Sequence, residues 1–175
     1  MIARFSACPV VRPRSFYFSA RTYTIASSLR SKLYTGRAES RGARQGMVRM
    51  ANPPLQTFLL SQPVEIGGPG GEGTNPEQLF ACAYAACFGG ALNVAAKEIN
   101  LSVPNTAVVK CQVHLGKKSD EEGLFLEVDM TLDGCRIPDE NIWKERMKRA
   151  HEICPYSKAI AGNVQVNLKV KPRIV

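Results

Sequence analysis

The sequence predicts an α+β fold in which helices and strands are mixed without regular alternation. Three observations indicate this: a long apolar helical pattern at about 76–98, two stretches of alternating apolar and polar residues at 106–116 and 124–133, and an amphipathic pattern at 138–154. The 175 residues, 45% of them hydrophobic, are enough for one core of ordinary size.

The elements before the long helix are short. LQTFLL, residues 55–60, is typical of a strand, whereas SRGARQGMVRM before it has no assigned structure. The glycine-rich loop at 66–74 superficially suggests a phosphate site. It lacks the Lys and Ser or Thr of a phosphate-binding loop and has Glu72 and Glu77 where a phosphate would be repelled, so we favour a tight connection.

The long helix begins with a clear start signal. Asn75 is placed as the side-chain cap, Pro76 occupies the first helical position, and Gln78 is placed for a capping box. Asn100 marks its end. The segment LFACAYAACFGGAL is apolar almost all round, which predicts a helix buried in a core or an interface.

The remaining elements follow from their periodicity. Each alternating stretch has one apolar face, and GKKSDEEG between them predicts antiparallel strands. Those faces consist of Val109, Cys111, Val113 and Leu115, and of Leu124, Leu126, Val128, Met130 and Leu132. The second helix has an apolar stripe that includes Trp143 and Met147, and Pro155 ends it. VQVNLKV, residues 164–170, predicts a closing strand.

The charge distribution divides the chain in two. Residues 1–38 contain seven of the 23 basic residues and no acidic one, which is typical of an organelle transit peptide. We therefore expect a disordered leader at 1–38 that directs the protein to the mitochondrial matrix, with the cytoplasm as the alternative, and a folded domain at 39–175. That domain has 16 basic and 15 acidic residues, which argues against nucleic-acid binding. The sequence contains no run of about 18 consecutive apolar residues, the length that a membrane-spanning helix needs, so we expect no membrane insertion.

Six cysteines, at positions 8, 82, 87, 111, 135 and 154, include no CxxC pair. We expect no metal, because Cys111 and His114 fall on opposite faces of a strand, and His151 with Cys154 lacks further ligands. A thiol in the middle of a helix, such as Cys87, needs a cation from elsewhere to become reactive. Cys154 is placed to cap a short helix after Pro155, where a thiolate is favoured.

Two blocks carry a specific resemblance. GGEGTNPEQLFACAYAACFGGAL, residues 70–92, and ICPYSKAIAGNVQVNL, residues 153–168, resemble the signature blocks of the organic hydroperoxide resistance (Ohr) branch of the OsmC/Ohr family. The resemblance implies an intertwined homodimer with long apolar central helices wrapped by antiparallel sheets. It also implies a thiol peroxidase without metal, flavin or haem.

The resemblance implies a catalytic set of Cys87, Cys154, Arg44 and Glu77. Cys87 matches the peroxidatic cysteine and Cys154 the resolving cysteine. Glu77 matches the acid that orients the arginine, and Arg44 matches the arginine that lowers the thiol pKa.

Two positions depart from the family pattern. The arginine usually follows two glycines, whereas this chain has Gly42 and Ala43 before Arg44, so Arg41 and Arg49 remain alternatives. Cys82 replaces a small residue, and the roles of Cys82, Cys111 and Cys135 stay open.

The activity implied is reduction of fatty-acid or alkyl hydroperoxides to alcohols through a Cys87 sulfenic acid and a Cys87–Cys154 disulfide. Lipoylated protein or dihydrolipoamide is the implied reductant. The alternatives are an OsmC-type enzyme of different substrate range, and a noncatalytic redox sensor or lipid-binding module.

Helix geometry adds one constraint. Ten residues separate Glu77 from Cys87, about 15 Å along a straight helix. Either the helix is broken near its start, or the acid, arginine and thiol come together across a subunit interface.

Overall fold

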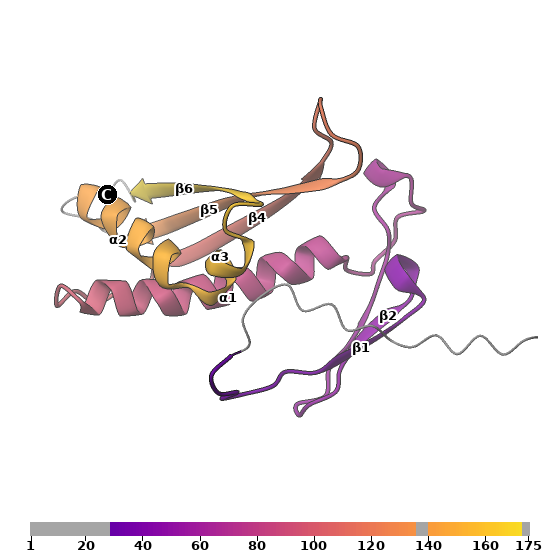
Figure 1. The fold of residues 1–175 in the computed structure, drawn as a ribbon, viewed down its shortest axis with the longest axis horizontal. Coiled ribbons are helices and arrows are strands. Elements are labelled where there is room, and N and C mark those ends of the chain that lie inside the picture. Colours follow the sequence, from indigo (N-terminus) through magenta and orange to yellow (C-terminus); the bar gives the residue numbers. More distant parts are fainter. Residues whose placement is uncertain (1–28, 136–139, 173–175) are drawn as a thin grey trace, which may run out of the picture. The chain divides into compact units, whose positions relative to one another are not determined.

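The computed structural model describes residues 29–135 and 140–172, so most of the expected leader, with Cys8, lies outside the described residues. The fold is mixed α+β, as the sequence predicts (Figure 1). In chain order its elements are β1 (Ala38–Arg41), η1 (Ala43–Gln45), β2 (Met47–Met50), β3 (Thr57–Leu59), η2 (Val64–Ile66), α1 (Pro76–Lys97), β4 (Val108–Gly116), β5 (Phe125–Cys135), α2 (Glu140–Ile153), α3 (Pro155–Ile160) and β6 (Gln165–Pro172).

The strands form two three-stranded sheets, in the orders β1-β2-β3 and β4-β5-β6. The first sheet and the β4–β5 pair are antiparallel, as expected. The expectation of purely antiparallel sheets is wrong for β6, which pairs with β5 in parallel. The cause is the connection: the chain between β5 and β6 passes through α2 and α3, and such a crossover returns the next strand in the same direction.

The first sheet contains a tight turn that the sequence left unassigned. Gly42, which joins β1 to η1, and Ala43, the first residue of η1, both have positive φ values, 73° and 50°. A Cβ atom on Gly46 would lie 1.8 Å from the carbonyl oxygen of Arg41, so only glycine fits there. This turn fixes the backbone that carries Arg44.

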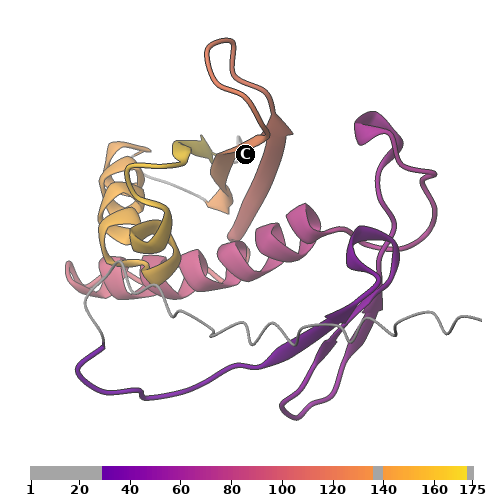
Figure 2. The same ribbon diagram turned by 45° about the vertical axis from the view of Figure 1, so that its right-hand side comes forward.

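The start of α1 agrees with the sequence prediction in part. The Asn75 side chain accepts a hydrogen bond from the backbone N–H of Gln78 at 2.9 Å, and Pro76 opens the helix. The Gln78 side chain, however, accepts from the Thr74 hydroxyl at 2.8 Å, which departs from the expected capping box. Figure 2 shows α1 as one continuous helix.

We expect Asn75→Ala to lower the free energy of unfolding by about 1 kcal/mol, because the substitution leaves a helix-start N–H without its acceptor. Urea unfolding followed by circular dichroism, at one fixed protein concentration, measures the change. Thr74→Ala is the matched control, since its hydroxyl bonds only a side chain. An equal loss in the two variants would contradict a special role for the cap.

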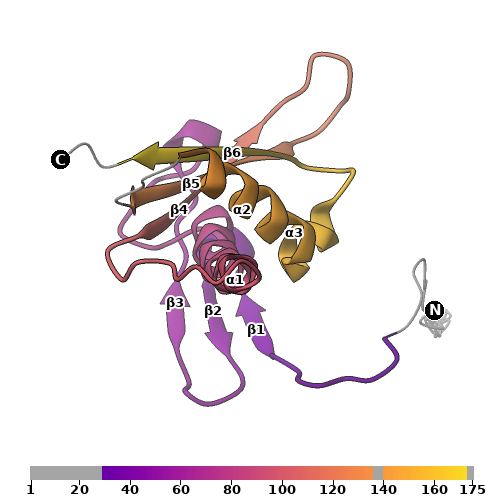
Figure 3. The ribbon, with the colours of Figure 1, turned by 90° about the vertical axis from the view of Figure 1, so that its left-hand side faces the viewer.

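The main core lies where α1 and α2 cover one face of the β4-β5-β6 sheet, and α3 packs against these two helices (Figure 3). Val128, Met130 and Leu132 of β5 are fully buried, which confirms the alternation predicted for that strand. Leu124, expected on the same face, lies before β5 and is 56% exposed. Trp143 and Met147 of α2 complete the core, as the apolar stripe predicts.

Within this chain α1 is buried on one side only. Tyr84, Phe88 and Leu92 are fully buried, whereas Ala83, Ala86, Gly90 and Val94 are exposed. By length and composition α1 could also cross a membrane, with a mean hydropathy of 1.6 over 18 residues, as core helices of soluble proteins can. The sequence criterion of consecutive apolar residues does not detect this helix, because Asn93 interrupts its apolar run.

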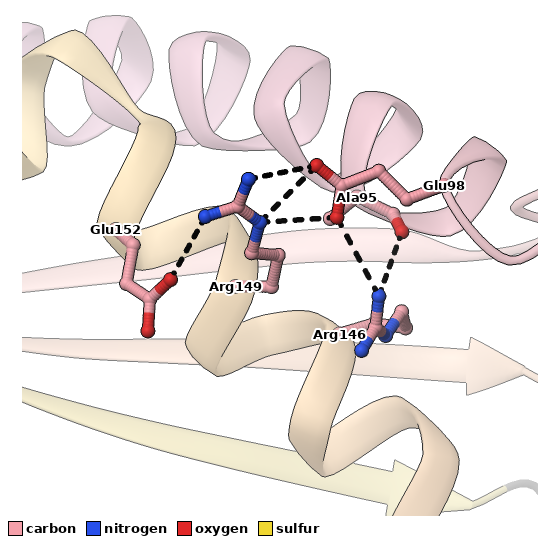
Figure 4. A network of polar contacts seen from close by, with 5 residues as sticks. All are labelled: Ala95, Glu98, Arg146, Arg149 and Glu152. Carbon is pink, nitrogen blue, oxygen red and sulfur yellow. Dashed lines mark hydrogen bonds and ion pairs between the residues drawn. The ribbon is translucent and has the colours of Figure 1, made fainter.

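Two arginines of α2 hold the C-terminal end of α1 (Figure 4). Arg146 donates to the carbonyl oxygen of Ala95 at 3.1 Å, and Arg149 forms a forked ion pair with Glu98. Ala95 lies in the last turn, where backbone carbonyls lack helical partners, so Arg146 satisfies one of them. These contacts fix α2, and the chain that continues from it, against α1.

Candidate active site

Cys87 and Cys154 lie face to face in one chain. Their sulfur atoms are 3.4 Å apart, although 67 residues separate them in the sequence. Cys87 projects from the middle of α1 and is half-buried, whereas Cys154 is fully buried. A disulfide bond is about 2.05 Å long, so a movement of about 1.4 Å would join the two thiols.

The short break between α2 and α3 positions Cys154. Its backbone is extended, and its N–H still donates to Ala150 at the end of α2, while its carbonyl accepts from Lys158 in α3. Pro155 occupies the first position of α3, where its missing N–H costs nothing. Cys154 is therefore the N-cap residue of α3, as predicted, although its side chain makes no capping hydrogen bond.

The surroundings of Cys87 favour the neutral thiol. Burial raises the pKa of Cys87, and the neighbouring Cys154 raises this pKa further. The backbone N–H of Tyr156 bonds the Cys87 sulfur and acts in the opposite direction. The rings of Phe80, Tyr84 and Tyr156 pack against one another, and Phe88 packs edge-on against Tyr84.

Arg44 and Glu77 form a second pair. The guanidinium donates two hydrogen bonds to the carboxylate, at 2.9 and 2.7 Å, in the bidentate geometry that makes such pairs strong. The hydrogen bond from Arg44 lowers the pKa of Glu77, so this carboxylate is charged at neutral pH. The structure thus brings together the predicted acid and arginine. Arg49, an alternative in the sequence, pairs with Glu39 instead.

The two pairs lie at different positions along α1. Because α1 is continuous from Pro76, Glu77 and Cys87 are about 15 Å apart along its axis. The interpretation that the helix breaks near its start is therefore wrong. Two hydrogen bonds hold Arg44 at Glu77, and among the described residues no cation contributes to the pKa shift of Cys87.

Residues 68–169 match the family described as OsmC-like protein. An organic hydroperoxide resistance protein from Xanthomonas axonopodis pv. citri is 38% identical over 136 residues, which cover 78% of this chain and 93% of the relative. The chain belongs to the OsmC/Ohr family. The resemblance seen in the two sequence blocks is thereby confirmed.

Solved structures of OsmC/Ohr proteins have the same fold. The organic hydroperoxide resistance protein OsmC of Legionella pneumophila superposes with a TM-score of 0.71 at 37% identity, covering 81% of this chain and 99% of that one. The organic hydroperoxide resistance protein OhrB of Bacillus subtilis gives 0.70 at 39% identity, covering 80% and 100%. Nearly the whole length of each relative therefore has a counterpart here.

Two further cysteines of this OsmC/Ohr chain, Cys82 and Cys111, are free thiols. Cys82 is exposed on α1, and five residues place it about 140° around the helix from Cys87. Cys111 on β4 faces α1, and burial, with Cys82 nearby, raises its pKa to about 11. The side chain of Cys135 lies outside the described residues. Among the described residues no group of three metal-ligating side chains gathers.

Sequence reasoning missed the polar contacts around the thiols. The Tyr84 hydroxyl lies 2.8 Å from the Ser157 hydroxyl, and both side chains are buried. The sequence spacing could have indicated this contact, because Tyr84 is three residues before Cys87 and Ser157 is three residues after Cys154. Residues three apart share one side of a helix.

The glycine-rich loop has a structural role. Gly73 donates its N–H to the Ser61 hydroxyl at 3.1 Å, and a Cβ atom at Gly73 would lie 2.6 Å from that oxygen. The loop therefore packs closely against the chain after β3, in agreement with the tight connection favoured from the sequence.

Proposed function

We propose that this OsmC/Ohr protein is a thiol-dependent peroxidase that reduces organic hydroperoxides to alcohols. The observation that carries the proposal is the 3.4 Å approach of Cys87 and Cys154 within a cluster of aromatic side chains. The relatives at 38% identity, named organic hydroperoxide resistance proteins, support a peroxide-related redox role.

The chemistry proceeds in two steps. The Cys87 thiolate attacks the O–O bond of ROOH, and a proton is taken up, giving the Cys87 sulfenic acid and the alcohol ROH. The Cys154 sulfur then attacks the Cys87 sulfur, and the hydroxyl leaves as water with the Cys154 proton. The resulting disulfide is reduced by an external dithiol, which is itself oxidised.

A homodimer supplies what one chain lacks. Strands β1, β2 and β3 have no buried residue, and α1 leaves an apolar face open, so both need a covering partner. In the arrangement we propose, Arg44 of the partner subunit approaches Cys87, with Glu77 holding the guanidinium. A cation beside Cys87 would offset the pKa increase that burial causes.

The lining of the site favours hydroperoxides with hydrocarbon tails. Phe80 and Phe88 lie in the core cluster around Cys87. Glu77 borders a cleft of about 410 Å³ whose apolar walls include Val113 and Leu115, so the arginine end also offers space for a tail. Fatty-acid hydroperoxides are the substrates we propose.

We also propose a mitochondrial address and a lipoylated reductant. The basic leader supports mitochondrial import. A matrix location would place the protein beside lipoylated enzymes, which supports lipoylated protein or dihydrolipoamide as the reductant. Arg37 already donates its backbone N–H to Asn52 and accepts from Ala51, so a cleavage that preserves these contacts must occur before Arg37.

Dithiol-dependent turnover of cumene hydroperoxide and of hydrogen peroxide by the full chain tests the proposal. We expect kcat/KM for the organic substrate to be higher by at least ~10-fold, because burial of two methylene groups at about 0.8 kcal/mol each exceeds 1.4 kcal/mol. A preference for hydrogen peroxide would favour the OsmC-type alternative. A single stoichiometric oxidation without turnover would favour the redox sensor.

A further inference from the structure

Tyr84 and Ser157 form a hydrogen bond at the junction of the two helices that carry the thiols. The hydroxyl oxygens are 2.8 Å apart, and the residues are 0% and 1% exposed. Tyr84 precedes Cys87 by three residues on α1, and Ser157 follows Cys154 by three residues on α3. One hydrogen bond therefore joins the two helices one turn from each sulfur.

Helix α3 depends on such contacts for its position. It has six residues, too few to be stable as a helix on its own. Besides the packing of the Tyr156 ring, its first turn has three polar contacts with α1: the sulfur pair, the Tyr156 N–H that bonds Cys87, and the Ser157 hydroxyl. The hydrogen bond between the hydroxyls is the only one of these three that does not involve a reacting sulfur.

We propose that Tyr84 and Ser157 are positioning residues that hold Cys154 against Cys87 so that the disulfide forms before a second peroxide reaches the sulfenic acid. The inference rests on the proposed function for its kinetic consequence. The hydroxyl pair selects one placement of α3, because a buried hydroxyl without its partner is costly. Aromatic packing alone would allow α3 to shift relative to α1.

The surroundings of Tyr84 keep its phenol protonated near neutral pH, which preserves the hydrogen bond with Ser157. Burial raises the pKa of Tyr84, the hydrogen bond with Ser157 lowers it, and charge on Cys154, Cys111 or Cys87 raises it again, so the pKa is raised on balance. The phenol thus stays protonated while the nearby sulfurs change their charge. It can donate to Ser157 throughout the catalytic cycle.

The test compares Tyr84→Phe, Ser157→Ala and the double variant in the full chain. After one equivalent of cumene hydroperoxide, we expect the rate of Cys87 oxidation to stay within about twofold of the wild-type rate. Disulfide formation should slow by about three- to tenfold, the factor that one ordinary hydrogen bond represents. Mass spectrometry should show more Cys87 sulfinic acid as peroxide increases.

Ser61→Ala is the matched control. It also deletes a hydroxyl that makes a hydrogen bond, with the Gly73 N–H at 3.1 Å, but this hydroxyl lies in the chain after β3 and contacts neither thiol helix through that bond. We expect its disulfide to form at the wild-type rate.

The double variant separates positioning from stability. It leaves no unpaired buried hydroxyl, so its unfolding midpoint should return toward the wild-type value. Disulfide formation should stay slow, because the contact that fixes α3 is still missing. Recovery of the disulfide rate together with stability, or wild-type rates in both single variants, would overturn the inference.

A second measurement does not depend on peroxide chemistry. In dithiothreitol redox buffers the fraction of Cys87–Cys154 disulfide reports how well the two sulfurs are held together. We expect the single and double variants to shift toward the dithiol by about the same three- to tenfold factor, and unchanged equilibria would contradict the inference. If the wild-type Cys87 failed to react with peroxide, the proposed function would fail, yet these equilibria would still decide the role of Tyr84 and Ser157.

Discussion

Cys87→Ser should abolish dithiol-dependent reduction of cumene hydroperoxide, lowering kcat by about a thousandfold or more. The serine hydroxyl is not ionised near neutral pH and is a far poorer nucleophile than a thiolate toward the O–O bond. Peroxide consumption by the full-length variant measures the effect. Activity equal to wild type would show that another thiol reacts first and would overturn the assignment of Cys87.

Cys154→Ser should separate the two chemical steps. Cys87 should still be oxidised once, but no disulfide can follow, so turnover stops and Cys87 proceeds to sulfinic acid with excess peroxide. Cys82→Ser is the matched control, because Cys82 lies on the same helix but faces about 140° away from Cys87. We expect this control to keep wild-type turnover, and its failure would assign Cys82 a role in the cycle.

Much of the fold could be predicted because local signals agreed with the tertiary structure. Asn75 and Pro76 mark a helix start by their own chemistry, and the buried alternation of β5 follows from its apolar residues. The short strands β1 and β2 gave no such signal, because their residues are mostly exposed within the chain. The parallel pairing of β6 depends on the path through α2 and α3, which periodicity does not contain.

The candidate site divides in the same way. The sequence blocks indicated Cys87, Cys154 and Glu77, and the match to the family's arginine pattern indicated Arg44. The structure brings these residues together as two pairs. The 3.4 Å approach of the sulfurs depends on helix packing across 67 residues, which no local pattern fixes. The backbone conformation of Ala43 could not be predicted either. Its φ of 50° explains why the family pattern has glycine at this position, but an alanine in the sequence does not indicate a positive φ.

Arg44→Gln should lower kcat/KM for organic hydroperoxide by about 100- to 1000-fold, the usual loss when a charge-stabilising donor is removed. The substitution also removes the cation proposed to offset the pKa increase of Cys87, so the thiolate should form only at higher pH. The pH profile of the rate should accordingly move to alkaline values. Arg49→Gln is the matched control, because Arg49 forms an exposed ion pair with Glu39.

Mixed dimers decide which subunit supplies the arginine. If Arg44 serves the partner's thiol, dimers that combine an Arg44→Gln subunit with a Cys87→Ser subunit contain one complete site. A 1:1 mixture should therefore recover about a quarter of wild-type activity, because about half of the dimers are mixed and each has one of two sites intact. Mixing Cys87→Ser with Cys154→Ser should recover nothing, because those sulfurs meet within one chain. No recovery in the first mixture would mean that Arg44 acts within its own chain. Arg44 would then have to leave Glu77 and reach a thiol about 15 Å away along α1, since the continuous helix fixes Cys87.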